Sequence, residues 1–279
     1  MIRLVPKLLK TALAGWWNDR ALSLGAAISF YTLFSMAPVL LIVVSVAGLI
    51  YGREAAQGAI VEEIGGLIGT KPAAAIEAMI ASANNFGSSI VGTVVGFTTF
   101  LFLATGALVE LQDDLNIIWK APPPEKSTIF VLLRTRVLSL ALVVAISFVL
   151  LVSLILDAGL SALTAYLPRI LPGSDAIIFT LNSISALASA CLLFGLIFKV
   201  LPDVDIAWRD VLVGAILTGF LFTLGKFLIG LYIGRSGVAS SYGAAGSLVT
   251  ILIWVYYSSQ ILLFGAEFTK AFADHRARR

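Results

Sequence analysis

About six apolar blocks dominate this sequence of 279 residues, each long enough to cross a lipid bilayer. A transmembrane helix needs about 20 mostly apolar residues to cross a hydrocarbon core about 30 Å thick. Backbone polar groups find no water in that core, so each block must cross it as a helix. The blocks therefore predict an all-α membrane protein, a bundle of about six transmembrane helices. They cover residues 21–50, 88–109, 137–157, 176–198, 211–233 and 247–266.

The composition agrees with lipid as the surrounding solvent. Hydrophobic residues make up 59% of the chain, charged residues 13%, and the mean hydropathy is +1.00. A soluble domain carries about 25% charged residues and could not hide so much apolar surface in one core. The single cysteine, Cys191, excludes a disulfide framework, and nothing near it has the spacing of metal ligands. We therefore expect no metal and no cofactor.

Basic residues orient the predicted bundle, because Lys and Arg accumulate on the cytoplasmic side of a membrane. If both termini are cytoplasmic, Lys226 lies within a span and most of the other basic residues lie inside. Of the 19 basic residues, only four would then lie outside: Arg53, Lys71, Arg169 and Arg235. This bias predicts cytoplasmic N- and C-termini. It also predicts contact between the cytoplasmic basic residues and anionic membrane lipids.

Two further segments are amphipathic and too polar to span. Residues 2–17 place Val5, Leu8, Leu9, Ala12 and Trp16 on one helical face, which is typical of a helix lying in the headgroup layer. Residues 53–85 repeat apolar side chains at helical spacing, and Thr70 begins a new helix there. They predict two short helices at the outer surface, or alternatively a small water-soluble cap packed on the bundle.

Polar side chains and a proline fall inside two predicted spans. Pro38 removes a backbone hydrogen bond from the first span, so we expect a kink or break there. Tyr31 and Ser35 precede it, and Gln260 lies in the sixth span. Polar groups at this depth either bond one helix to another or line a cavity for a polar headgroup.

Charged residues at matched depths suggest two ion-pair sites. Lys226 lies in the fifth span, and Asp157 lies at a similar depth near the outer end of the third. This pair could be a structural clamp or line a polar pathway, and Lys226 could instead extend toward the outer interface. The second site is at the inner ends of the spans, where an ion-pair network or an inner gate for an ionic substrate could form. Its members are Glu110, Glu267, Arg134 and Arg136.

An enzyme is not expected from these residues. Metal-dependent hydrolysis needs clustered His, Asp or Glu ligands, yet the only histidine is His275 in a basic tail. That tail satisfies the positive-inside bias and requires no nucleic acid as partner. No nucleotide-binding loop is present, so active transport would need an ion gradient or a partner protein.

Several motifs in chain order resemble the YihY/BrkB family. They are the run Ala27-Ile-Ser-Phe-Tyr-Thr-Leu-Phe-Ser-Met-Ala-Pro38, Leu115-Asn-Ile-Ile-Trp119, Lys199-Val-Leu-Pro202, Trp208-Arg-Asp210, Ser241-Tyr-Gly-Ala-Ala-Gly-Ser247 and Gly265-Ala-Glu-Phe268. The resemblance implies a bacterial inner-membrane protein with six helices, of a family whose members carry the labels ribonuclease BN, virulence factor and transporter. We expect a transporter or lipid-handling protein, with a non-transporting envelope scaffold or regulator as the alternative and a membrane-bound ribonuclease as a weaker one.

Overall fold

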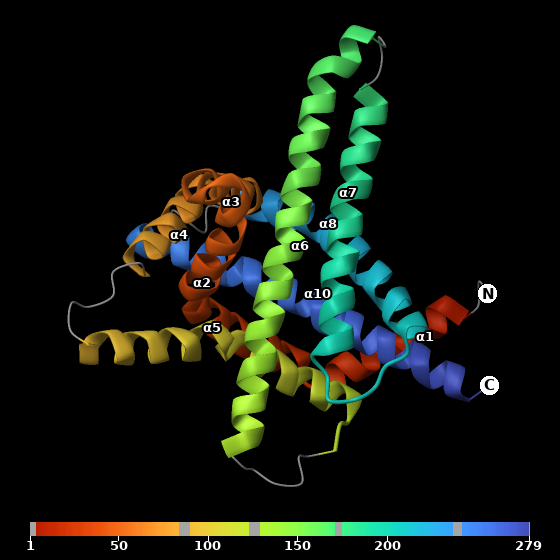
Figure 1. Ribbon diagram of the computed structural model, residues 1–279. Helices are drawn as coiled ribbons and strands as arrows, with labels where there is room; N and C mark the ends of the chain where they lie inside the picture. The colour runs from red at the N-terminus through yellow and green to blue at the C-terminus, as the bar shows by residue number, and fades with distance from the viewer. Residues whose placement is uncertain (1–3, 84–89, 123–128, 171–174, 237–241, 279) are drawn as a thin grey trace.

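The computed structural model describes residues 4–83, 90–122, 129–170, 175–236 and 242–278, in places as backbone alone. Regular structure in these residues is helical, which confirms the predicted all-α class (Figure 1). In chain order the helices are α1 (Leu4–Asn18), α2 (Ala21–Tyr51), α3 (Arg53–Ile68), α4 (Thr70–Ala83), α5 (Ile90–Trp119), α6 (Ile129–Ile170), α7 (Asp175–Val200), α8 (Trp208–Ser236), the 3-10 turn η1 (Gly243–Ala245) and α10 (Gly246–Ala277).

Within the described residues, five helices are long and apolar enough to cross a membrane: α2, α6, α7, α8 and α10. They coincide with five of the predicted spans. The remaining predicted span, 88–109, falls on α5 and begins in residues outside the described ones. The helical membrane bundle is therefore confirmed, and the count of six spans stays a prediction.

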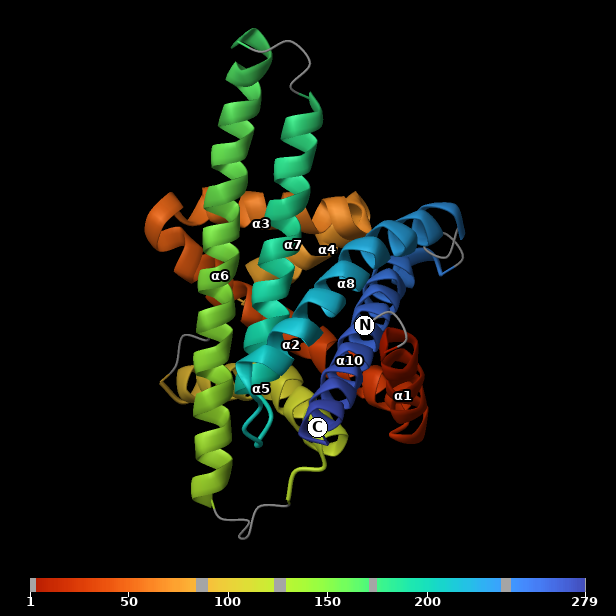
Figure 2. The same ribbon diagram turned by 90° about the vertical axis from the view of Figure 1, so that its right-hand side faces the viewer.

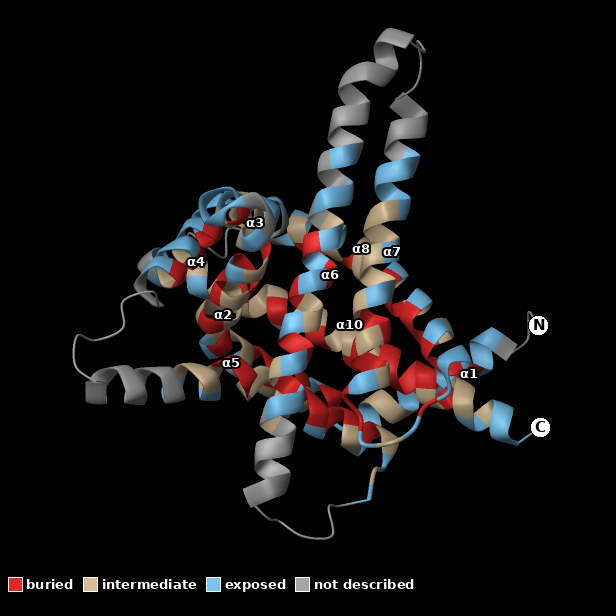
Figure 3. Ribbon diagram, viewed as in Figure 1, coloured by how far each residue is buried: buried red, intermediate tan, exposed pale blue. Residues whose placement is uncertain are grey.

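The spanning helices carry many exposed residues (Figure 3), and large apolar side chains are among them. Phe227 on α8 is 69% exposed, and Phe148 on α6 is 58% exposed. Water-soluble monomers rarely leave contiguous apolar surface of this kind, whereas lipid chains cover it without penalty.

Glycine separates the first helices, while proline does not. The helix α2 runs without a break from Ala21 to Tyr51 through Pro38, so the predicted break is not seen. Contacts of α2 with α5, α6 and α10 hold the chain helical despite the missing backbone donor. The helix ends at Gly52, where φ is 81°, and Gly69 separates α3 from α4 at a φ of 93°. Residues with side chains rarely adopt such angles.

The helices α3 and α4 lie against the bundle. Ile68, Ile76 and Ile80 pack on Leu41 of α2 and Ile251 of α10. The acidic side chains of these two helices are on the exposed side: Glu54, Glu62, Glu63 and Glu77. One apolar face is thus buried on the spanning helices, as both alternatives for residues 53–85 require.

Reciprocal pairs of glycine and threonine bring α8 and α10 together. A side chain at Gly214 of α8 would collide with Thr269 of α10, and one at Gly265 of α10 would collide with Thr218 of α8. Each threonine hydroxyl donates to the carbonyl oxygen of the glycine four residues earlier in its own helix, over 2.7 Å. The antiparallel helices therefore approach closely at two adjacent turns, as small residues allow in membrane proteins.

The helices α6 and α7 form a hairpin that projects beyond the other helices (Figures 1 and 2). With 42 residues, α6 is about 63 Å long at 1.5 Å per residue, roughly twice the hydrocarbon thickness. In the predicted orientation, the end of this hairpin lies outside the membrane on the outer side.

Candidate functional site between α1, α8 and α10

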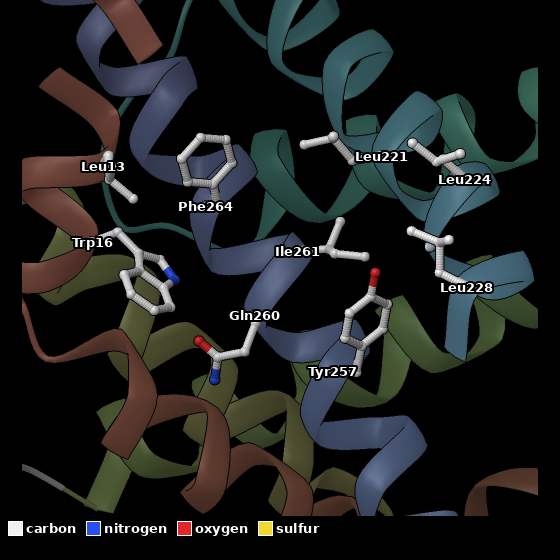
Figure 4. A pocket seen from close by; sticks show the side chains of 10 residues that line it. Leu13, Trp16, Leu221, Leu224, Leu228, Tyr257, Gln260, Ile261 and Phe264 are labelled. Atoms are coloured by element: carbon white, nitrogen blue, oxygen red, sulfur yellow. The ribbon is translucent and has the colours of Figure 1, made fainter. Parts of the chain in front are cut away.

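A pocket of about 330 Å³ lies between the N-terminal helix α1 and the spanning helices α8 and α10 (Figure 4). Its walls are mostly apolar, and several of them reach the lipid-facing surface. Leu13 is 57% exposed, Leu224 48% and Leu228 49%. The lining residues are Leu13, Trp16, Leu221, Leu224, Gly225, Leu228, Tyr257, Gln260, Ile261 and Phe264.

Helical spacing explains why these side chains converge. On α10 the lining positions 257, 260, 261 and 264 recur at intervals of three and four residues, as do positions 221, 224, 225 and 228 on α8. At Gly225 a side chain would meet Ile261 at 2.7 Å and the Tyr257 ring at 2.8 Å. Glycine therefore lets α8 approach α10 at this level, and the larger neighbours shape the pocket around the contact.

Two polar atoms of the lining residues are buried and have no partner within the described part of the chain. They are the Trp16 Nε1 donor and the Gln260 Oε1 acceptor. The Gln260 Nε2 group is already used, because it donates to the Ala21 carbonyl oxygen over 3.2 Å. An unpaired buried polar atom costs about 1–3 kcal/mol. Each of these two pocket-lining residues therefore keeps one unused hydrogen-bonding atom among the described residues.

The helix α1 closes the pocket because it is held against the C-terminal half of α10 (Figure 2). Leu8 and Ala12 are buried on Phe268 and Ala271. Glu267 of α10 is only 3% exposed and lies beneath α1, where a side chain at Gly15 would collide with its carboxylate. Leu8 and Ala12 of the apolar face of α1 therefore pack on protein, while Val5 on the same face is 51% exposed, and the placement of this helix in the headgroup layer stays a prediction. An apolar face suits a lipid surface and a protein surface equally, so the sequence pattern could not distinguish them.

The ends of α8 and α10 are joined by an ion pair. Arg276 in the last turn of α10 donates from Nη2 to Asp210 Oδ2, 2.8 Å away, in the first turn of α8. The Asp210 side chain is 3% exposed and that of Arg276 is 48% exposed. The carboxylate also lies at a helix N-terminus, where negative charge is favoured.

A short loop between α7 and α8 is anchored to the end of α5 by Asp203. Its carboxylate accepts hydrogen bonds from Gln112 Nε2, over 3.1 Å to the nearer oxygen, and from Asn116 Nδ2 over 2.8 Å. The Asp203 backbone N–H in turn donates to Asn116 Oδ1 over 2.8 Å. The loop thus fixes the start of α8 relative to α5.

Sequence comparison places these features in a known group. Residues 12–279, nearly the whole chain, match the profile of the family described as Virulence factor BrkB. The chain belongs to the BrkB family. Membership confirms the resemblance drawn from the sequence motifs.

Curated BrkB-family relatives carry the name UPF0761 membrane protein. One from Pseudomonas aeruginosa is 28% identical over 258 residues, which is 89% of this chain and 58% of the relative. One from Rhodospirillum centenum is 26% identical over 277 residues, covering 96% of this chain and 58% of the relative. The chain therefore spans under two thirds of the length of these relatives. No solved structure matches it.

In this BrkB-family protein, the charged residues that were expected to meet at the inner ends of the spans contact different neighbours. Arg136 of α6 donates from Nη1 to Thr105 Oγ1 over 2.8 Å and to the Phe102 carbonyl oxygen over 3.2 Å. No carboxylate among the described residues lies within 4.0 Å of Arg136. Glu110 is half-buried on α5 and Glu267 faces α1, so these three do not form one network. The structure does not describe the side chain of Arg134.

Ser35 and Tyr31 lie where α2 meets α5. The Ser35 hydroxyl donates to the Leu103 carbonyl oxygen over 2.6 Å and accepts from the Ala107 N–H over 3.2 Å. Those two backbone groups are four residues apart, so the hydroxyl bridges both ends of one helical hydrogen bond. Tyr31 is 43% exposed and packs edge-on against Phe30. Ser35 therefore joins two helices, and neither residue lines the pocket.

Lys226 is half-buried on α8, next in sequence to the pocket residue Gly225. The side chain of its expected partner, Asp157, lies outside the described ones, so this pair stays a prediction. Among the described residues no group of three His, Cys, Asp or Glu side chains could hold a metal ion. The expected absence of a metal site and of catalysis also stays a prediction.

The pocket residues Leu13, Trp16 and Leu228 were not expected from the sequence. Trp16 belongs to a helix that was placed in the headgroup layer, and Leu228 is one apolar residue among many. The close packing at Gly214 and Gly265 was also not expected from the sequence. The pattern Gly-x-x-x-Thr at 214/218 and 265/269, read as small residues four apart, was the available signal.

Asp114, beyond the apolar part of α5, predicts a dependence of stability on pH. Burial, together with the smaller effect of the neighbouring Glu110 and Asp113 carboxylates, raises its pKa from 3.8 to about 7. The folded state therefore keeps a proton that the unfolded chain loses, so this group lowers stability as pH rises from 3.8 to about 7. Asp114→Asn should raise the unfolding temperature in detergent at neutral pH and above, with little effect near pH 3.8. The exposed Asp274→Asn is the control; equal shifts in both variants would contradict the prediction.

Proposed function

We propose that this BrkB-family protein binds a membrane lipid or similar amphiphile in the α1–α8–α10 pocket and moves it across the bilayer. The pocket itself is the observation that supports the proposal. Its apolar walls suit an acyl chain, and its exposed leucines give that chain access from the lipid phase. The unpaired Trp16 donor and Gln260 acceptor suit a hydroxyl-bearing headgroup.

A dithionite assay tests the movement. The purified protein is reconstituted in liposomes that carry a fluorescent phospholipid in both leaflets, and dithionite then quenches the outer leaflet. We expect quenching to proceed to completion with the protein and to stop at the outer leaflet without it.

Leu228→Trp tests whether the pocket is the route, because the larger indole would fill the space between α8 and Ile261. We expect the rate to fall by roughly tenfold, equivalent to about 1.4 kcal/mol. Leu212→Trp is the matched control on the same helix, since Leu212 is 55% exposed and does not line the pocket. Equal rates in the two variants would show that the lipid does not pass through this pocket, and no movement with the unchanged protein would overturn transport.

The projecting α6–α7 hairpin favours the second candidate, an envelope scaffold. A helix of about 63 Å extends beyond the bilayer and offers surface to other envelope proteins. If shortening the hairpin removes associated proteins while lipid movement remains, the scaffold role is separate from transport.

A further inference from the structure

Arg136 lies on a different part of the bundle from the pocket, where α6 meets α5. Its guanidinium carbon is 4.1 Å from the centre of the Phe102 ring, and Phe102 is 60% exposed on the outside of the bundle. Nη1 is occupied by Thr105 Oγ1 and the Phe102 carbonyl oxygen. The guanidinium is thus held in place by three contacts with one helix.

Among the described residues, these contacts leave the guanidinium charge without a counter-charge. No carboxylate of the described residues is within 4.0 Å, and Nε and Nη2 of Arg136 make no hydrogen bond within the same set. An arginine near the bilayer is costly unless it has a counter-ion. The remaining N–H donors form a planar fork of the kind that binds phosphate oxygens.

An apolar stripe continues from this position along α6. Val137, Val144 and Phe148 are 58%, 44% and 58% exposed, and they recur at intervals of seven and four residues on one face of the helix. A chain lying on this stripe would begin beside Arg136. In the predicted orientation that point is at the cytoplasmic end of the span, where lipid phosphates lie.

We propose that Arg136 and Phe102 form a binding site for the phosphate of an anionic phospholipid, with an acyl chain of that lipid along Val137, Val144 and Phe148. The fixed guanidinium supplies the charge, and the stripe distinguishes a lipid from a free phosphate ion. The site shares no residue with the α1–α8–α10 pocket, so it does not depend on the proposed transport.

Thermal unfolding of the full chain in detergent tests the site with three additions: phosphatidylglycerol, phosphatidylcholine and inorganic phosphate. We expect phosphatidylglycerol alone to raise the unfolding temperature. Arg136→Gln should weaken the apparent affinity for phosphatidylglycerol by roughly tenfold. The control Lys71→Gln removes an equal charge from an exposed position on α4, outside the predicted cytoplasmic set, and should leave that affinity unchanged.

Phe102→Leu covers the case in which Arg136→Gln does not fold. The ring is exposed, so its loss should barely change stability without lipid, yet it removes the surface on which the guanidinium rests. We expect a several-fold loss of affinity for phosphatidylglycerol. The proposal is overturned if phosphatidylcholine or phosphate alone stabilises the protein equally, or if the Arg136 and Phe102 variants both keep the affinity of the unchanged protein.

Discussion

Gly265→Thr should force α8 away from α10 and lower the free energy of unfolding by about 1–3 kcal/mol or more. The added side chain would occupy the space of the buried Thr218 side chain, which is 0% exposed and cannot move toward solvent. Thr218 is also fixed by its hydrogen bond to the Gly214 carbonyl oxygen. Unfolding of the purified variant in detergent, followed by heat or by added SDS, measures the effect.

A matched variant and a compensating one make this prediction specific. Gly230→Thr adds the same side chain to α8 at a position with no atom within 4 Å, so it should change stability little. Adding Thr218→Gly should rescue Gly265→Thr, because the threonine on α10 would then face a glycine on α8 and the collision would be removed. If Gly265→Thr is as stable as Gly230→Thr, the close approach of α8 and α10 described above is wrong.

Arg276→Met should destabilise the protein by about 3–5 kcal/mol, because it leaves the buried Asp210 carboxylate without its partner. Asp210 Oδ1 already lacks a hydrogen bond within the described residues, so among these residues only the N-terminus of α8 offsets the loss. The thermal unfolding temperature in detergent should therefore fall sharply.

Two variants separate the loss of the pair from the loss of one charge. Arg278→Met removes a neighbouring exposed arginine and should have little effect, as expected for surface charges. Combining Arg276→Met with Asp210→Asn should recover most of the stability, because the neutral amide carries no unpaired charge. A double variant as unstable as Arg276→Met alone would mean that the arginine acts through packing.

Hydropathy predicted the helices well because a bilayer allows few alternatives. A block such as residues 211–233 is apolar along nearly its whole length, with Lys226 as its only charge, and lipid requires its backbone to be helical, so α8 follows from composition alone. The break between α3 and α4 at Gly69 was predictable from a different signal, because Thr70, Lys71 and Pro72 mark the start of a helix. The positive φ of Gly69 adds the reason why α3 ends there.

Partners were much harder to predict than elements. The apolar face of a helix can pack on lipid or on protein. The sequence pattern of α1 therefore could not show that Leu8 and Ala12 pack on α10. Arg136 was expected to pair with a carboxylate at the same depth in the membrane. Depth alone, however, does not determine which neighbouring helix the side chain faces. Rotation of α6 brings this residue to the α5 backbone instead. Gln260 donates to the Ala21 carbonyl oxygen and is among the pocket-lining residues, and its part in a polar pathway stays a prediction.

The helix α10 runs without a break from the pocket to the end of the bundle that is predicted to be cytoplasmic. Gln260 and Arg276 are on α10, about 24 Å apart along a straight helix. A tilt of α10 that widened the gap at Tyr257 would, by leverage, also strain the ion pair with Asp210 and the contact of Glu267 with Gly15. In the predicted topology, a molecule that bound Arg276 from the cytoplasm would therefore act on the pocket through α10 without entering the membrane.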